Sequence, residues 1–165
     1  EVEFELDGKT GTLPLPALIN LRSHPSADVR GRAYLLEQAT FEDMKETLAA
    51  SSSPWNIVYM HYPPYSSGMH GSTDWARWPY QAWGADAVLS GHDHTYERLL
   101  VDGMTYFVNG AGGYSLYDFG NIVEGSQVRY NADYGAMRME ATDDYLLFQF
   151  FNRNNELIDQ VEMSK

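Results

Sequence analysis

The chain has 165 residues, which fits a single domain and is long enough to bury a core. Apolar residues make up 44% of it and aromatic residues 14%, and this composition excludes a disordered chain. The formal net charge of −12 disfavours nucleic acid as a partner, because an acidic chain repels phosphate backbones, while it still attracts divalent cations. No cysteine is present, so any metal site must use nitrogen and oxygen ligands.

The beginning of the chain, residues 1–5, is acidic and lacks the basic and apolar segments of a signal peptide. No apolar run reaches the roughly 18 residues that a membrane span requires. We therefore expect a soluble chain with no membrane partner. The compartment stays open, since a mature secreted protein would have the same features.

The first 50 residues predict a turn or hairpin followed by helices. Residues 2–6 alternate between apolar and polar side chains, and Asp7-Gly8 then favours a turn. Ser26 is a candidate N-cap, and apolar residues at helical spacing after it predict two helices, or one kinked helix, over residues 27–50.

Two apolar runs in the middle of the chain predict buried strands, over residues 55–60 and 85–90. The first is followed by a loop rich in proline, serine and glycine, over residues 62–72, and by a short helix over residues 74–83 that Pro79 disturbs. The pattern of strand, helix and strand favours an α/β fold.

The last third of the chain predicts strands alone. These are expected over residues 104–109, 135–141, 145–151 and 156–163, the last three as an antiparallel meander. The run 145–151 is very apolar, and we expect it to be exposed to water if part of the fold is lost.

Histidines follow both of the predicted central strands. His61 comes directly after the first, and Gly91-His92-Asp93-His94 follows the second. A lone His-x-His pair is more often two solvent-facing loop histidines than a metal site. Because ligands in α/β sheets collect beyond the carboxyl ends of strands, three of the five histidines at such ends favour a metal site.

These segments resemble one family. Residues 55–68, His70-Gly71 and residues 86–98, which contain the Gly-His-x-His motif, are similar to the calcineurin-like metallophosphoesterases, and most to their purple or tartrate-resistant acid phosphatase branch. The resemblance runs from about residue 40 to the carboxyl terminus. It implies an α/β (α+β) fold: half of an α-β-β-α sandwich, with helices against a mixed sheet and antiparallel strands at the end.

The resemblance also implies roles for individual residues. His61 and His92 would bind one metal ion and His94 its neighbour, while His70 would face the phosphate as an electrostatic clamp or as proton donor to the leaving group. The alternative for His70 is a mobile loop residue without a role. Tyr62, Tyr96, Glu97 and Arg98 are candidates to brace the histidines from behind, although an ion pair explains Glu97 and Arg98 equally well.

Three motifs of that family have no counterpart upstream of His61: Asp-x-His, the Gly-Asp that supplies a bridging carboxylate, and Gly-Asn-His. Residues 1–38 instead resemble a helical, non-catalytic segment of oligoendopeptidase-F-like peptidases, without their His-Glu-x-x-His motif. We therefore expect one domain over residues 1–165, with a foreign helical lead-in over 1–38 and a truncated phosphoesterase-like region over 39–165.

The absence of a bridging carboxylate makes other residues candidate auxiliary ligands. His24, Asp28 and Asp93 have suitable side chains. For His24 and Asp28 the ordinary interpretation, an exposed loop histidine and an aspartate at a helix amino terminus, is favoured.

The expected function is hydrolysis of phosphomonoesters or phosphodiesters, with broad specificity and with zinc, iron or manganese as cofactor. A non-catalytic remnant that folds and binds a metal or a partner is the alternative. A third possibility is a single zinc ion held by the three histidines. We also expect a homodimer, because a two-fold interface would cover apolar surface that the missing part of the fold leaves exposed.

Overall fold

A computed structural model of the chain describes residues 2–6, 9–13 and 41–165. The chain divides into two compact units, Glu1–Ala50 and Ser51–Lys165. In the first unit, strands β1 (Val2–Leu6) and β2 (Lys9–Leu13) pair antiparallel, which confirms the predicted hairpin. A helix occupies residues 41–50, the last part of the predicted helical region. Ser26 and the rest of that region lie outside the described residues.

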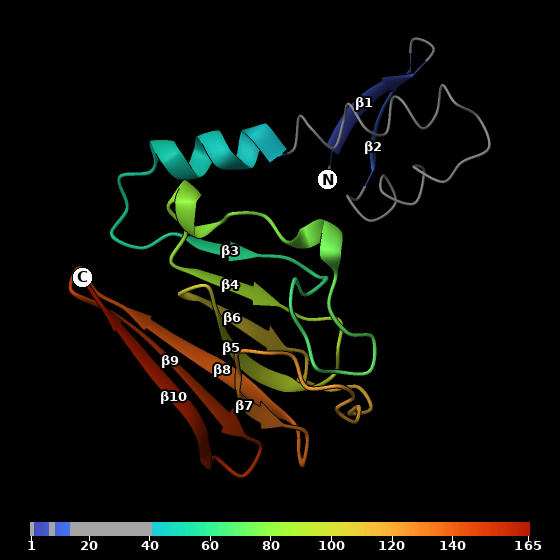
Figure 1. The fold of residues 1–165 in the computed structure, drawn as a ribbon, viewed down its shortest axis with the longest axis vertical. Helices are drawn as coiled ribbons and strands as arrows, with labels where there is room; N and C mark the ends of the chain where they lie inside the picture. The colour runs from blue at the N-terminus through green and yellow to red at the C-terminus, as the bar shows by residue number, and fades with distance from the viewer. Residues whose placement is uncertain (1, 7–8, 14–40) are drawn as a thin grey trace. The chain divides into compact units, whose positions relative to one another are not determined.

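The second unit contains a five-stranded mixed sheet (Figure 1). Its order is β3 (Ile57–Tyr59), β4 (Ala87–Ser90), β6 (Met104–Asn109), β5 (Tyr96–Val101) and β7 (Ser126–Tyr130). β3, β4 and β6 run parallel, whereas β5 is antiparallel to both of its neighbours, β6 and β7. β3 and β4 are the two buried strands that the sequence predicts ahead of the histidines.

A three-stranded antiparallel sheet faces the first one. It consists of β8 (Gly135–Ala141), β9 (Tyr145–Asn152) and β10 (Leu157–Ser164), in the order β10-β9-β8, which confirms the predicted meander. β9 lies in the middle, and its side chains are alternately buried and partly buried. The expectation that this strand would be left exposed is therefore wrong, since β8 and β10 occupy both of its edges.

The core lies between the two sheets. Leu146, Phe148 and Phe150 of β9 are at most 1% exposed and point at the larger sheet. The Phe148 ring packs against Phe107 at a centroid distance of 4.6 Å, and Phe150 stacks on Tyr96 at 4.0 Å. The two-residue periodicity of a strand places these side chains on one face and leaves Leu147 on the other.

Two parts of this unit differ from the sequence-based expectations. The predicted helix over residues 74–83 forms two short 3-10 helices, η2 (Asp74–Ala76) and η3 (Gln81–Trp83), with Pro79 between them. β5 and β7 were not expected. The β5 sequence contains Glu97 and Arg98, and charged residues disfavour a buried strand. Such a strand forms only where residues from elsewhere in the fold bind the charged side chains. No helix of the described residues is long and apolar enough to cross a membrane.

We expect Phe148→Ala to lower the free energy of unfolding by about 3–5 kcal/mol, because the side chain is fully enclosed between the sheets. Leu147→Ala, one residue away on the opposite face of β9, is the matched control and should cost clearly less. Urea unfolding followed by tryptophan fluorescence measures both. Equal losses would contradict the placement of Phe148 on the inner face of β9 and Leu147 on its outer face.

Candidate active site

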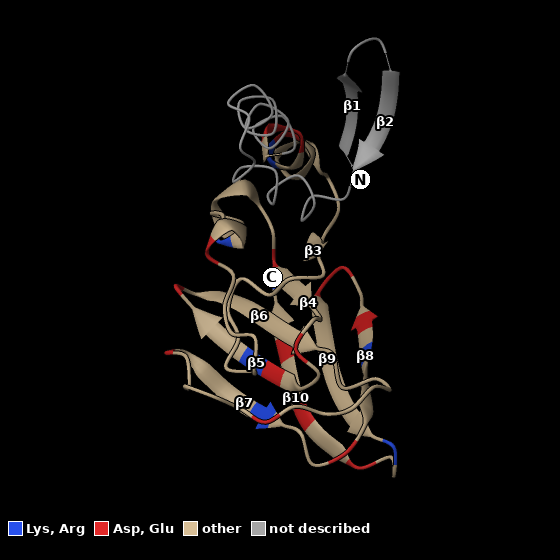
Figure 2. Cartoon of the chain, turned by 90° about the vertical axis from the view of Figure 1, so that its right-hand side faces the viewer, with Lys and Arg blue, Asp and Glu red and all other residues tan. Residues whose placement is uncertain are grey.

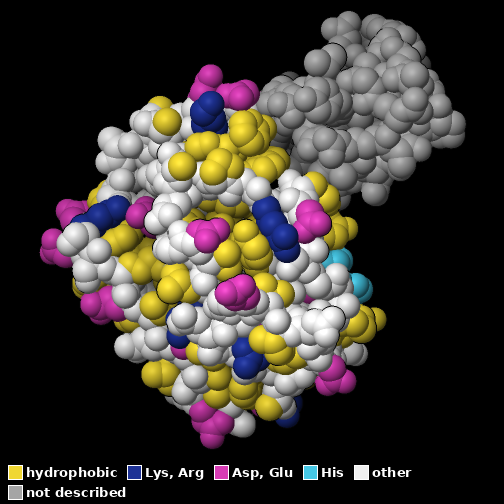
Figure 3. Space-filling view, in the orientation of Figure 1, with side chains coloured by type: hydrophobic (Ala, Val, Ile, Leu, Met, Phe, Trp, Pro, Cys, Tyr) yellow, Lys and Arg dark blue, Asp and Glu magenta, His cyan; other side chains and the backbone are white. Residues whose placement is uncertain are grey.

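The carboxyl ends of β3 and β4 bring two histidine-bearing loops together. The strands are parallel neighbours, so both end at the same edge of the sheet. Their pairing continues past the strand ends: the Met60 amide donates to the Leu89 carbonyl at 2.9 Å and the Gly91 amide to the His61 carbonyl at 3.1 Å. Figure 3 shows histidine side chains gathered at this side of the unit, toward which the arrows of β3 and β4 point in Figure 1.

His61 and His92 face each other through ring nitrogens. His61 Nε2 lies 3.1 Å from His92 Nδ1, and the two rings meet edge to face. In a tetrahedral site with zinc–nitrogen bonds of ordinary length, two ligand nitrogens stand roughly 3.3 Å apart. The separation therefore fits two imidazoles that share one ion, and equally a hydrogen bond in which one ring donates to the other.

His92 adopts a left-handed backbone conformation, with φ of 65°. Glycine is the residue that most readily adopts such an angle, yet here it falls on the histidine and not on the preceding Gly91. Burial lowers the pKa of His92, and the neighbouring His70 and His61 lower it further. A lowered pKa keeps the imidazole neutral, which is the form that binds metals.

His94 is oriented by the loop that follows β6. Its Nδ1 lies 3.0 Å from the carbonyl oxygen of Ser115. Since a carbonyl only accepts, Nδ1 carries a proton, and in the neutral ring this tautomer leaves the lone pair on Nε2, as in most metal-binding histidines. The ring stacks on Tyr117 at 4.1 Å and meets Tyr114 edge to face at 5.2 Å.

His70 lies beside the same cluster. Its ring centroid is 4.5 Å from that of His92 and 5.4 Å from that of Tyr117, so Tyr117 lies against both His70 and His94. Its side chain is exposed, while its backbone amide donates to Asp93 Oδ1 at 2.8 Å. The structure thus brings His61, His70 and His92 into direct ring contact and places His94 next to them through Tyr117.

The residues that were expected behind the histidines have diverse contacts. The Tyr62 ring packs against His61 and, at 4.4 Å, against His92. Tyr96 and Arg98 both bind Asp159 on β10 through their side chains, so they connect the two sheets. β5, which carries Glu97 next to Arg98, shows an acidic segment beside a basic one in Figure 2.

The carboxylates of Asp93 and Glu97 are fully buried. Asp93 accepts hydrogen bonds from Ser66 and from the His70 amide, and Glu97 accepts them from Ser67 and Ser126. Glu97 and Arg98 point to opposite faces of β5 and do not pair with each other, because successive side chains of a strand alternate. His24 and Asp28 lie outside the described residues.

Sequence reasoning did not identify Tyr117, Ser66 and Ser67 as part of this region. The serines lie within the segment that carries the family resemblance, so their position in the motif was a usable signal. Tyr117 had none, because its loop comes near His94 only through tertiary pairing: the Tyr117 amide donates to the His94 carbonyl at 3.1 Å.

The fit of these residues to a metal centre is partial. His61 and His92 present nitrogens to one position, and His94 presents another, but no group of three or more His, Asp or Glu side chains in the described part of the chain is arranged to hold an ion. Imidazole nitrogens alone suit zinc and iron without selecting between them. Further ligands are needed to complete the site.

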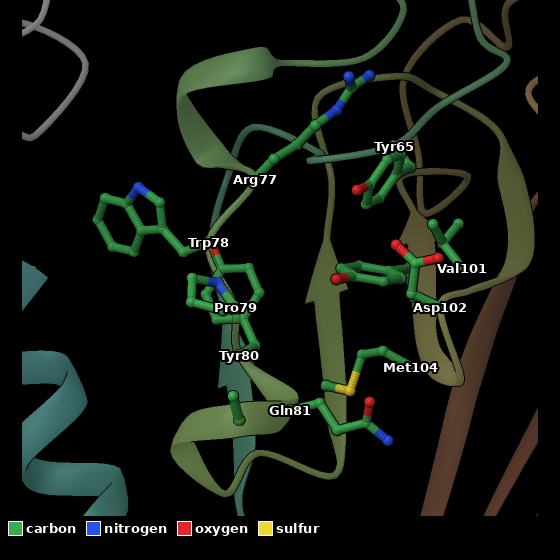
Figure 4. Close-up of a pocket in the computed structure, with 11 residues that line it drawn as sticks. Tyr65, Arg77, Trp78, Pro79, Tyr80, Gln81, Val101, Asp102 and Met104 are labelled. Atoms are coloured by element: carbon green, nitrogen blue, oxygen red, sulfur yellow. The ribbon is translucent and has the colours of Figure 1, made fainter.

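A separate cavity of about 370 Å³ is lined by residues of the 62–83 segment and by residues of β5, β6 and the turn between them. Figure 4 shows Arg77 and Tyr65 at one end of it and Gln81 and Met104 at the other. None of the four clustered histidines is among its lining residues. The cavity is therefore distinct from the histidine site, and its Arg77 guanidinium is already engaged with Asp74, the Pro64 carbonyl and the Tyr65 ring.

Comparison with known proteins supports one family. Human tartrate-resistant acid phosphatase type 5 is 32% identical over 90 residues, which cover 52% of this chain and 28% of that protein. Purple acid phosphatase 3 of Arabidopsis thaliana is 29% identical over 119 residues, covering 67% and 32% respectively. The structure of purple acid phosphatase PPD1 from yellow lupin has a similar fold, with a TM-score of 0.68 and 23% identity over 75% of this chain and 28% of that one.

The chain thus spans about a third or less of the length of these relatives. The family model described as calcineurin-like phosphoesterase matches residues 6–96, which is more than half of the chain. That match begins within the segment that resembles a peptidase, and a foreign origin of residues 1–38 stays a prediction. The chain belongs to the calcineurin-like phosphoesterase family.

Proposed function

We propose that this chain takes part in metal-dependent hydrolysis of small phosphate esters, with His61, His92 and His94 as metal ligands and His70 facing the substrate. The observation that carries the proposal is the approach of His61 Nε2 to His92 Nδ1 at 3.1 Å, beside the ring of His70. The family points to a phosphoesterase that uses divalent or paired metal ions. The substrates, the metal and the activity itself belong to the proposal.

The three proposed ligands are held by the chain itself. His61 and His92 follow parallel strands, and the Ser115 carbonyl sets the His94 tautomer. When bound, metal ions in such a site polarise phosphoryl oxygens and offset locally the acidity of the chain. Nitrogen ligands favour zinc or iron, and manganese becomes suitable if the missing ligands are oxygens.

His70 is the proposed contact to the phosphate. Its ring is exposed, so it is accessible to a substrate, and it lies against His92. A protonated imidazole here would attract the phosphate and deliver a proton to the oxygen that leaves.

A non-catalytic role is the second candidate, and a specific observation favours it. The family's Asp-x-His, Gly-Asp and Gly-Asn-His motifs do not occur upstream of His61, and the described residues offer no complete ligand group. A chain that binds a metal through the three histidines without turnover would have this arrangement.

The missing ligands are proposed to come from a second copy of the chain in a homodimer. Tyr59 on β3, the terminal strand of the described five-stranded sheet, is 84% exposed, which supports an interface near the site. Asp93 is not suited to ligate a partner's ion in this arrangement, because it is buried and both of its oxygens accept hydrogen bonds. Asp28 and His24 stay candidates.

We expect His92→Gly and His94→Ala each to reduce the metal content of the purified protein and to abolish hydrolysis of p-nitrophenyl phosphate and bis(p-nitrophenyl) phosphate. Glycine is the better substitution at His92, because it removes the imidazole and tolerates the positive φ. Elemental analysis by mass spectrometry measures the metal. Full occupancy in both variants would refute the ligand assignment, and metal binding without hydrolysis in the unaltered chain would favour the non-catalytic role.

His70→Ala should leave the metal content intact and lower kcat by about 100-fold for esters with poor leaving groups, which need protonation most. The loss should be smaller for p-nitrophenyl esters. Steady-state kinetics across a series of phenyl phosphates measures the difference. A loss that does not depend on the leaving group would exclude proton donation by His70.

The homodimer predicts that specific activity depends on protein concentration. Analytical ultracentrifugation across a wide dilution series should show a dimer, with activity falling as it dissociates. Tyr59→Asp should weaken the dimer if β3 lies in the interface, and Leu100→Asp, at an exposed apolar residue on β5, is the matched control. A monomer with undiminished activity at the lowest concentration would exclude the shared site.

A further inference from the structure

The loop that carries His70 combines an exposed histidine with buried polar side chains. Ser66 and Ser67 are each 1% exposed, and the carboxylates that receive them, Asp93 and Glu97, are 0% exposed. Burying two carboxylates in a chain of net charge −12 is unfavourable unless each is hydrogen-bonded. The fold accepts this cost beneath the loop that carries His70, where serine and backbone donors meet both carboxylates.

Asp93 binds the loop at two points and reaches a third through a serine. Oδ1 accepts the His70 amide at 2.8 Å, and Oδ2 accepts the Ser66 hydroxyl at 2.5 Å. The Ser66 oxygen in turn accepts the Gly68 amide at 2.9 Å. One carboxylate therefore sets the path of the backbone from Ser66 to His70.

Close packing leaves the Asp93 side chain and backbone little room to shift. A Cβ atom at Gly68 would lie 2.4 Å from Asp93 Cγ, and one at Gly110 would lie 2.1 Å from the Asp93 carbonyl oxygen. Only glycine lets the loop and the end of β6 approach this closely. A shift of the Asp93 carboxylate would therefore displace the loop that carries His70.

Glu97 secures the loop one residue further along. It accepts the Ser67 amide at 2.7 Å and the Ser67 hydroxyl at 2.6 Å, and it also accepts the Ser126 hydroxyl from β7. The Ser67 oxygen accepts the Val123 amide at 2.9 Å. Glu97 thereby attaches the loop to the rigid sheet, while the only hydrogen bond to the His70 backbone comes from Asp93 among the described contacts.

We propose that Asp93 is a positioning residue that holds His70 against His92. It thereby fixes the distance between His70, which faces the phosphate, and the histidines that face the metal. This inference rests on the proposed function. Asp93 stands between His92 and His94 in the chain, so one residue links the proposed ligands to the proposed proton donor. A carboxylate suits this place because its two oxygens accept from an N–H and an O–H at the same time.

A double-mutant cycle separates positioning from simple stabilisation. Asp93→Ala should lower kcat about as much as His70→Ala, and the two together should lose no more than His70→Ala alone, because Asp93 acts through His70. Asp93→Asn should recover a large part of the activity, since its oxygen can accept the His70 amide while its NH₂ donates to Ser66. Asp74→Ala, in the same segment with a carboxylate 89% exposed, is the control and should retain full activity. Additive losses would overturn the proposal.

A second measurement does not depend on turnover. The rings of His70 and His92, 4.5 Å apart between centroids, should give nuclear Overhauser effects in protein with ¹³C-labelled histidine. These should persist in Asp93→Asn and Asp74→Ala and vanish in Asp93→Ala. If the unaltered chain hydrolyses no ester, the proposed function fails and these effects alone decide the position of His70. Their persistence in Asp93→Ala would overturn the proposal. Should that variant not fold, Ser66→Ala replaces it and should weaken the effects.

Discussion

The parallel pairing of β3 with β4 is the constraint on which the site depends. Parallel neighbours end at the same edge of a sheet, so the loops after Tyr59 and Ser90 must leave side by side. The hydrogen bond from the Gly91 amide to the His61 carbonyl extends that pairing into the loops. The contact between His61 and His92 follows from the strand register, and a shift of one residue would direct these side chains to different faces.

The two sheets supply the rigidity that this edge needs. Leu146, Phe148 and Phe150 of β9 pack against the inner face of the larger sheet, and Asp159 of β10 binds both Tyr96 and Arg98 of β5. β5 therefore has two roles: one face is attached to the second sheet, and Glu97 on the other face secures the loop that carries His70. Hydrogen bonds to buried charges are stronger than those between neutral groups, which suits an element that must hold an exposed loop in place.

The four clustered histidines are held in defined orientations, but they do not form a complete set of metal ligands. The histidines are oriented by groups such as the Ser115 carbonyl, which is the kind of support that metal sites require. Yet the described residues contain no carboxylate that is free to bridge two ions near His61 and His92. The chain covers about a third or less of the acid phosphatases with which it was compared. Hydrolysis by this chain would therefore require metal ligands from other protein groups.

The amino-acid sequence by itself determined the α/β class, the strands that precede His61 and Gly91, the carboxyl-terminal meander and the family, because these depend on local apolar patterns and on motifs that are contiguous in the chain. Tertiary structure alone decided that β5 and β7 are strands, that His92 and not Gly91 adopts the positive φ, and that Asp93 and Glu97 accept hydrogen bonds from the His70 loop. Strands with buried charges form only where distant partners supply hydrogen bonds or opposite charges. From the sequence alone, a carboxylate next to two histidines is as compatible with a metal ligand as with a residue that positions the loop. Only the folded positions of Ser66, Ser67 and the His70 amide distinguish the two, since hydrogen bonds between residues 23 to 30 positions apart leave no periodic pattern in the sequence.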